Sequence, residues 1–364
     1  MTRVRPPVRA EEITPEWLTG ALQERHPGAQ VSAVEVVDRA EVTNAHARLN
    51  IVYEHPAGAP ASMFCKLLPN DGRRAAIANT RMGSKEVRFY QDLAPRLELR
   101  VPIIHAAVCD PDDESFVLLM EDLVSTGCTV SNGTWGVDAD GAAAALTGLA
   151  ELHARFENPA RRAAEAPWVP EPTFGSTYGS VMLRYGIDHH RDRLSDAFAS
   201  IAELYVDHGR ALFELWTSGP KTIIHGDTHI GNLFFDHGTV GFLDWGIINV
   251  NTPMREVSYF LSMAMNIEDR RNCERDLLLQ YLDARRSFGA SDITFDDAWL
   301  AHRIHAAYCV VASCQIVTFP AKMSEGRRIF SEAFLARAEA AISDLDALGA
   351  LRGAGLSTRT PSDG

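Results

Sequence analysis

Three oxygen-bearing side chains lie within the segment Thr222–Trp245, and their spacing suits phosphoryl transfer. Asn232 precedes a short apolar strand and Asp244 follows the next one, so hairpin pairing would place the two residues on adjacent chains. Amide and carboxylate oxygens held in this way favour one shared Mg²⁺ ion. Asp227 lies five residues before Asn232. It is then available to position an attacking hydroxyl group and take its proton, the second task in this chemistry.

The same segment allows a second interpretation, because His225, Asp227 and His229 form an H-x-D-x-H pattern. Zinc hydrolases bind their metal through clusters of this kind. A zinc site would leave Asn232 without a role. We therefore favour the first interpretation, in which both histidines support the loop. A zinc-dependent hydrolase is kept as an alternative.

The motifs of this region resemble those of a known superfamily. They are H-G-D-T-H-I-G-N at His225–Asn232, L-D-W at Leu243–Trp245 and R-E-V-S-Y-F-L at Arg255–Leu261. They are similar to the aminoglycoside phosphotransferase and choline-kinase-like superfamily, most of all to its ecdysteroid-kinase-like branch. In element order the resemblance covers Thr14 to Leu348. A catalytically inactive, kinase-like nucleotide-binding protein would keep the same motifs and is a further alternative.

The resemblance implies a two-lobed, protein-kinase-like α+β fold, with a small antiparallel-sheet N-lobe and a larger helical C-lobe. It also implies transfer of the γ-phosphoryl group of ATP or GTP to a hydroxyl of a small molecule, with Mg²⁺ as the metal. In that reaction Asp227 would be the base, and Asn232 and Asp244 would hold the metal.

The elements before the motif region predict the small lobe, over residues 1–121. Thr14 is expected to cap a first helix with Pro15 at its first position. Strand-like runs lie at Val31–Val37, Ala47–Tyr53 and Ser62–Leu68, two more surround the turn Asp110–Asp113 and end in Phe116–Met120, and a helix is expected near Thr80–Leu97.

Lys66 and Glu86 interrupt otherwise apolar patterns in this lobe. Lys66 lies mid-strand in M-F-C-K-L-L, and Glu86 opens the apolar face of the expected helix. Because a buried charge needs a partner, we expect the two to pair. Kinases use such a pair to hold the lysine against the α- and β-phosphates. By resemblance, Met120, Glu121 and Leu123 belong to the hinge between the lobes, whose backbone would read adenine.

The turn between the first two strands departs from the superfamily. Members usually carry glycine or serine there, whereas Arg39–His46 contains no glycine. Side-chain Cβ atoms hinder a close approach of the backbone to phosphate. Thr43 and Asn44 are left to supply polar contacts, and the choice between ATP and GTP stays open.

Helical patterns dominate the rest of the chain and predict the larger lobe over residues 122–354, followed by a flexible tail at 355–364. A linker rich in Ser, Thr and Gly lies at Val124–Trp135. Helical periods follow at Gly141–Phe156, Arg191–Trp216, Met254–Asn266 and Arg271–Phe288, with two more towards Leu348. His153 falls on an apolar stripe and is expected to be a core histidine.

Composition narrows the partners and the compartment. The net charge of −13 argues against nucleic-acid binding, because no basic surplus exists to neutralise phosphates. The longest nearly apolar run, Ala306–Phe319, is too short to span a bilayer and predicts a buried helix. The start lacks a secretory pattern, and six scattered cysteines fit a reducing cytoplasm.

The acceptor is not fixed by the sequence. The acidic composition suits an amine-bearing acceptor, such as an aminoglycoside or an amino alcohol. The branch resemblance suggests a more lipophilic alcohol. All three classes remain open, as does the oligomeric state.

Overall fold

The computed structural model describes residues 5–41, 43–318 and 323–356. The chain forms two compact units. Unit 1 takes in the chain up to Thr129 together with Phe234–His237 and Gly241–Ile248. Unit 2 takes in Val130–Leu233, Gly238–Val240 and the chain from Asn249 onward. Unit 1 therefore runs past residue 121 and includes the segment that carries Asp244. Most of the expected tail, from residue 357 on, lies outside the described residues.

Unit 1 is built on a five-stranded antiparallel sheet, as predicted. In spatial order its strands are β1 (Gln30–Glu41), β2 (Ala45–His55), β3 (Ser62–Leu67), β5 (Phe116–Glu121) and β4 (Ile104–Cys109). Successive side chains of a strand point to opposite faces. Met63, Cys65 and Leu67 of β3 belong to the hydrophobic core of the unit, so Lys66 points to the other face.

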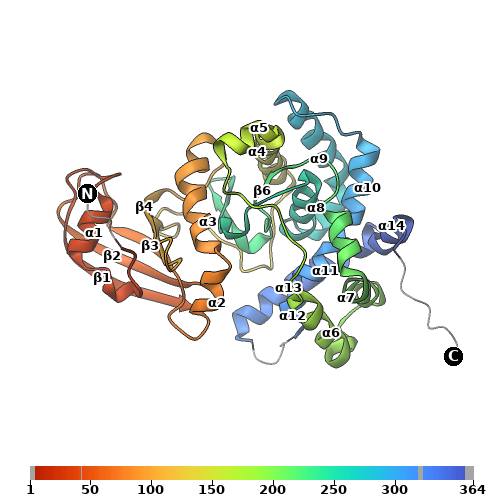
Figure 1. The fold of residues 1–364 in the computed structure, drawn as a ribbon, viewed down its shortest axis with the longest axis horizontal. Coiled ribbons are helices and arrows are strands. Elements are labelled where there is room, and N and C mark those ends of the chain that lie inside the picture. Colours follow the sequence, from red (N-terminus) through yellow and green to blue (C-terminus); the bar gives the residue numbers. More distant parts are fainter. Residues whose placement is uncertain (1–4, 42, 319–322, 357–364) are drawn as a thin grey trace. The chain divides into compact units, whose positions relative to one another are not determined.

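Helix α1 (Pro15–Leu22) covers the core face of this sheet (Figure 1). The expected cap is present, because the Trp17 backbone N–H donates to Thr14 Oγ1 at 3.2 Å. Leu18 and Leu22 of the helix are fully buried in the core. A helix of this length is stabilised mainly by the burial of its apolar face and only slightly by the helix propensity of its residues.

The chain near Thr80–Leu97 is helical, but it does not form the single helix that the pattern predicts. Helices α2 (Arg74–Asn79) and α3 (Met82–Arg88) are followed by a π-helical turn at Phe89–Leu93 and a 3₁₀ turn at Ala94–Arg96. Pro95 cannot donate a backbone hydrogen bond, which favours an end to the regular helix there. Glu86 lies in α3, before these changes of pitch.

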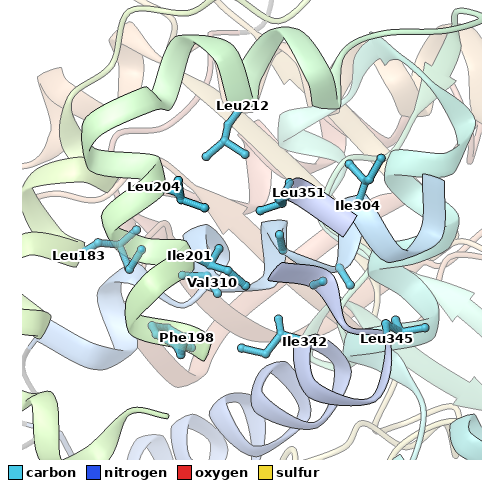
Figure 2. Close-up of a cluster of buried hydrophobic side chains, with 14 of the residues drawn as sticks. Leu183, Phe198, Ile201, Leu204, Leu212, Ile304, Val310, Ile342, Leu345 and Leu351 are labelled. Atoms are coloured by element: carbon cyan, nitrogen blue, oxygen red, sulfur yellow. The ribbon is translucent and has the colours of Figure 1, made fainter. Parts of the chain in front are cut away.

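Unit 2 is mostly helical, which with the sheet of unit 1 confirms the predicted α+β class. Its helices are α4 (Ala139–Glu157), α5 (Pro159–Glu165), α6 (Tyr178–His190), α7 (Asp196–Trp216), α8 (Pro253–Ala264), α9 (Ile267–Ser287), α10 (Phe295–Ala306), α11 (Tyr308–Ala312), α12 (Cys314–Thr318), α13 (Glu325–Asp344) and α14 (Ala347–Gly353). Figure 2 shows one hydrophobic cluster of this unit, where Phe198, Ile201 and Val310 are fully buried.

Short strands surround the motif region. β6 (Thr222–Ile224) pairs antiparallel with β9 (Asn249–Asn251). β7 (Leu233–Asp236) and β8 (Thr239–Phe242) form the predicted two-stranded hairpin. His237 and Gly238 both have positive φ angles, 48° and 92°, as the turn of a tight hairpin requires.

The nearly apolar run Ala306–Phe319 forms two short helices, α11 and α12, instead of one, and Phe319 itself lies outside the described residues. Ser313 separates them, and its hydroxyl donates to the Cys309 carbonyl at 2.7 Å. None of the helices formed by the described residues combines the length and apolar character needed to cross a bilayer. All six cysteines lie in the described ranges, and none of them is in a disulfide.

Candidate active site

Unit 1 brings Lys66 and Glu86 together as a buried ion pair. Lys66 Nζ on β3 lies 2.6 Å from Glu86 Oε2 on α3, and both residues are less than 5% exposed. Asp244 joins them, with its Oδ1 3.0 Å from the same Nζ. Burial lowers the pKa of Lys66, but the two carboxylates outweigh that effect and raise it above its ordinary value. Lys66 therefore stays a cation throughout the physiological range.

Asp244 is held in an unusual backbone conformation beside α3. Its φ and ψ angles of 58° and 65° are left-handed, which is uncommon for a residue other than glycine. The next residue, Trp245, is fully buried and stacks on Phe89, with ring centroids 3.7 Å apart and an angle of 7° between the planes. Gly246 follows, and a Cβ there would lie 3.1 Å from Met82 Cβ. These contacts fix the direction in which the Asp244 carboxylate points.

Two polar side chains lie at the turn between β1 and β2 and at the start of β2. Asn44 is only 3% exposed, and its Oδ1 has no hydrogen-bond partner among the described residues. His46 pairs with Lys66 across β2 and β3, so both side chains are on the same face of the sheet. Burial and the Lys66 charge lower the pKa of His46 to about 4, so its ring is neutral near pH 7. Thr43 is exposed, and Val42 lies outside the described residues.

The expected hinge residues occupy the end of β5 and the turn after it. Met120 pairs with Phe64 on one side and Ile104 on the other, so its peptide groups belong to the sheet. The Glu121 backbone N–H donates to the Ile103 carbonyl at 2.7 Å. Leu123 follows the strand and is half-buried.

Unit 2 holds Asp227 by several donors. Asn232 Nδ2 donates to Asp227 Oδ2 at 3.0 Å and to the Asp227 carbonyl at 2.9 Å. The Tyr259 hydroxyl donates to Oδ1 at 3.2 Å, and His229 Nε2 lies 3.6 Å from Oδ2. Burial raises the pKa of Asp227, but these neighbours, led by His229, outweigh it and lower the pKa to about 2. The carboxylate is therefore ionised and fixed in orientation.

A buried network supports the loop on which Asp227 stands. The Gly226 backbone N–H donates to Glu256 Oε1 at 2.9 Å, and Gly226 has a φ of 92°, which other residues rarely adopt. Glu256 Oε2 lies 2.9 Å from His153 Nε2, and His153 Nδ1 lies 2.8 Å from the Tyr281 hydroxyl. His153 is thus a hydrogen-bonded core histidine, as expected. It links Tyr281 on α9 to Glu256 on α8, and Glu256 in turn bonds the loop.

The remaining motif histidines also support the loop. His225 is fully buried, and its Nδ1 accepts the Asp227 backbone N–H at 3.2 Å. His229 Nδ1 accepts the Gly231 backbone N–H at 3.0 Å. The described residues, which include the whole H-x-D-x-H segment, contain no group of three or more His, Cys, Asp or Glu side chains arranged to hold a metal.

Two of these residues carried a signal that the sequence reasoning did not use. Glu256 and Tyr259 both lie in the R-E-V-S-Y-F-L motif of α8, a helix in which every residue is buried. A glutamate in such a helix needs a partner, just as Lys66 did. Arg100, which bonds Glu121 and Asp236, carried no such signal in the sequence. Asn232 belongs to unit 2 and Asp244 to unit 1, so their sharing of one cation stays a prediction.

Comparison with known proteins identifies the family of the chain. The model of the family described as "Phosphotransferase enzyme family" matches residues 66–290, which is more than half of the chain. The chain belongs to the phosphotransferase enzyme family. The match covers Lys66, Asp227 and Asp244, and it confirms the prediction of a phosphotransferase at the level of the family. Such an enzyme takes its phosphoryl group from a nucleotide co-substrate.

Solved structures of the same kind of enzyme are similar to this phosphotransferase. A putative aminoglycoside phosphotransferase from Ralstonia eutropha is 14% identical, with a TM-score of 0.49, over 90% of this chain and 97% of that one. A choline kinase from Streptococcus pneumoniae is 12% identical, with a TM-score of 0.47, over 87% and 94%. The GDP complex of wild-type aminoglycoside 2'-phosphotransferase-IIIa is 15% identical, with a TM-score of 0.46, over 91% and 98%. No curated protein matches the chain.

Proposed function

We propose that this protein transfers the γ-phosphoryl group of ATP or GTP to a hydroxyl group of a small molecule. The observation that carries the proposal is the Asp227 carboxylate, which is ionised and held by Asn232 and Tyr259 in a phosphotransferase-family chain. A carboxylate fixed in this way can orient an acceptor hydroxyl and accept its proton as the new P–O bond forms. Asp227 is the proposed catalytic base.

Lys66 is proposed to hold the nucleotide phosphates. Its ammonium group is buried between Glu86 and Asp244, so its charge and position are fixed before any nucleotide binds. A preorganised cation of this kind binds phosphate oxygens without a further ordering cost. Leu123 and the backbone beyond β5 would read the nucleotide base.

The residues present suit a magnesium ion. Asn232 uses its Nδ2 for Asp227, which leaves its amide oxygen as the atom able to ligate a metal. The Asp244 side chain is 38% exposed and offers carboxylate oxygens. Hard oxygen donors of this type are those that Mg²⁺ prefers. When bound, the ion would neutralise charge on the transferring phosphoryl group.

Aromatic side chains pack around His229, beside Asp227. His229 contacts the rings of Tyr259, Phe330 and Phe334, at centroid distances of 5.3–6.4 Å. Aromatic side chains bury apolar surface well and attract cations only at their faces. Tyr259 and Phe334 are buried in the core, so all three acceptor classes, a lipophilic alcohol, an amino alcohol and an aminoglycoside, stay in the proposal.

Acceptor-dependent release of ADP or GDP tests the function directly. The panel contains sterol-like alcohols, choline and other amino alcohols, and aminoglycosides, each with Mg²⁺ and either nucleotide. We expect one class to stimulate release well above the background of nucleotide hydrolysis. If Mg²⁺-nucleotide stabilised the fold against heat but no acceptor raised release, the inactive nucleotide-binding alternative would replace this proposal. Stoichiometric zinc in the purified protein would instead support the alternative function, a zinc-dependent hydrolase.

A further inference from the structure

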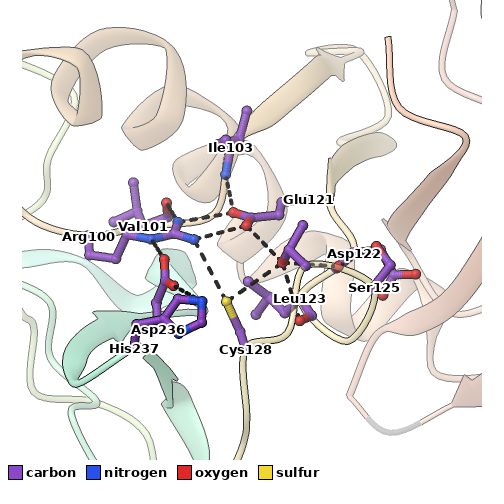
Figure 3. Close-up of polar contacts among 11 residues, drawn as sticks. Arg100, Val101, Ile103, Glu121, Asp122, Leu123, Ser125, Cys128, Asp236 and His237 are labelled. Atoms are coloured by element: carbon purple, nitrogen blue, oxygen red, sulfur yellow. Dashed lines mark hydrogen bonds and ion pairs between the residues drawn. The ribbon is translucent and has the colours of Figure 1, made fainter.

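Arg100 joins three separate stretches of unit 1 through one guanidinium group (Figure 3). The residue lies in the connection between the 3₁₀ turn at Ala94–Arg96 and β4. Its Nη1 and Nη2 donate to Glu121 Oε2 and Oε1 at 3.0 and 2.9 Å, and its Nε donates to Asp236 Oδ2 at 2.8 Å. Glu121 ends β5, and Asp236 ends β7. One cation therefore bridges the proposed hinge and the hairpin that leads to Asp244.

The remaining donors of Arg100 are also used. Nη1 donates to the Val101 carbonyl at 2.6 Å, and Nη2 lies 3.9 Å from Cys128 Sγ. The guanidinium carbon lies 4.8 Å from the centre of the Phe234 ring. A guanidinium has five N–H donors in a fixed fork, and here each has a partner. The backbone takes part as well, because the Phe242 N–H donates to the Arg100 carbonyl at 2.9 Å.

The Glu121 carboxylate collects further contacts from the proposed hinge. It accepts the Ile103 backbone N–H at 3.1 Å and the Thr126 hydroxyl at 3.0 Å. Burial raises the pKa of Glu121, but the hydrogen bonds from Arg100 and the other donors outweigh it and lower the pKa. The carboxylate is thus ionised, and its two oxygens match the Arg100 fork. Both ends of the segment Glu121–Thr126 are tied to this one group.

We propose that Arg100 is a positioning residue for the nucleotide. It holds the peptide segment after β5 in a fixed position relative to the hairpin that leads to Asp244. The inference rests on the proposed function, because it takes these two stretches to be the ones that meet the base and the phosphates. The carboxylates that Arg100 bonds are those of Glu121 and Asp236, and it acts through them. Its substitution should therefore weaken nucleotide binding and leave acceptor binding unchanged.

Arg100→Lys is the informative variant. Lysine keeps the positive charge but replaces the planar fork by a point charge, so it cannot satisfy both oxygens of Glu121 and Asp236 together. Arg155→Lys is the matched control. Arg155 bonds Glu165 in unit 2, and the side chains of that pair are 27% and 21% exposed, close to the 21% and 27% of Arg100 and Asp236.

Titration calorimetry with Mg²⁺-ATP and Mg²⁺-GTP gives the direct readout. Losing the forked hydrogen bonds should raise the dissociation constant of the preferred nucleotide about tenfold in Arg100→Lys. In Arg155→Lys it should stay within about twofold. Asp236→Asn, a gentler variant, should shift it in the same direction by a smaller factor. Steady-state kinetics should show the change in the KM of the nucleotide and not in that of the acceptor. Equal nucleotide affinity of Arg100→Lys and the wild type would overturn the inference.

Failure of the inference and failure of the proposed function are distinguishable. A wild-type protein that binds nucleotide but phosphorylates no acceptor defeats the function and leaves the calorimetric test intact. If the wild type bound no nucleotide, amide hydrogen exchange of residues 121–128 would still decide. We expect faster exchange there in Arg100→Lys than in Arg155→Lys, and unchanged exchange would overturn the role of Arg100.

Discussion

The surroundings of Lys66 and of Asp227 solve the problem of a buried charge in opposite ways. Lys66 lies between the carboxylates of Glu86 and Asp244, so unit 1 balances charge with charge. Asp227 is held by an amide, a phenol and a histidine, so unit 2 fixes a carboxylate mainly with directed hydrogen bonds. Ion pairing sets electrostatic potential, whereas directed hydrogen bonds set orientation. The comparison teaches that unit 1 should govern nucleotide affinity and unit 2 the rate of transfer.

The largest effect should come from Asp227→Asn. The amide keeps the shape of the side chain but cannot accept the acceptor proton, so kcat should fall about 10²–10⁴-fold. Nucleotide affinity should change little, because Lys66, the residue proposed to hold the phosphates, lies in unit 1. Steady-state kinetics with the acceptor found in the panel, paired with calorimetry, measure both quantities. Full turnover by this variant would show that Asp227 is not the base.

Lys66→Met should show the reverse pattern. Nucleotide affinity should fall strongly, and stability should fall by about 3 kcal/mol because Glu86 loses its buried partner. Burial raises the pKa of Glu86 and Lys66 opposes that rise, so Glu86 depends on Lys66 for its charge. The double variant Lys66→Met, Glu86→Gln should regain much of the stability but none of the affinity. Chemical denaturation and calorimetry separate the two. A double variant that recovered nucleotide binding would contradict the role of Lys66.

Tyr259→Phe tests whether a single hydrogen bond in unit 2 orients the Asp227 carboxylate. It removes one donor to Asp227 Oδ1 and keeps the ring that packs in the core. Loss of one hydrogen bond to a charged group should lower kcat roughly three- to tenfold, with little change in either KM. Tyr308→Phe is the control, since the Tyr308 ring packs edge-to-face against that of Tyr259, whereas it is the Tyr259 hydroxyl that bonds Asp227. Equal kcat values for the two variants would mean that the phenol does not orient the base.

The smallest effect concerns pH. The pKa of Asp227 is lowered to about 2 in the folded protein, below the value of about 3.9 expected in an unfolded chain. Its stabilising contribution is therefore complete above pH 4 and is lost as pH falls towards 2. Between pH 8 and pH 5 the value of kcat should not decline through Asp227. A pH profile of kcat checks this, and an acid limb near pH 6 that disappeared in Asp227→Glu would contradict it.

Local pattern predicted much of this architecture. The strands of unit 1, the hairpin at Leu233–Phe242 and the pairing of Lys66 with Glu86 all follow from alternation, turn chemistry and the cost of a buried charge. The same reasoning missed α6 (Tyr178–His190), in which only Leu183 and Gly186 are buried while Tyr178, Val181 and Tyr185 are exposed, so no continuous apolar stripe marks the helix. It also predicted one helix near Thr80–Leu97, where the π-helical turn at Phe89–Leu93 lets Phe89 stack on Trp245.

The supporting contacts of the site could not be read from local pattern. Asp227 is held by Tyr259, which lies 32 positions later, and Arg100 bonds Asp236 across 136 positions. Contacts of this kind depend on the packing of whole elements, which a window of a few residues does not contain. The H-G-D-T-H-I-G-N spacing predicted which residues could do chemistry, and tertiary structure decided what holds them.

Unit 1 is formed by stretches of the chain that are far apart in the sequence. A truncated protein ending at Thr129 would keep Lys66, Glu86 and Phe89 but lose Asp244 and Trp245, which belong to the same compact body. Such a fragment would expose one face of an aromatic stack and leave Lys66 with a single carboxylate. Recombination between related genes therefore meets the same constraint: a functional exchange of unit 1 must carry two distant stretches of coding sequence together.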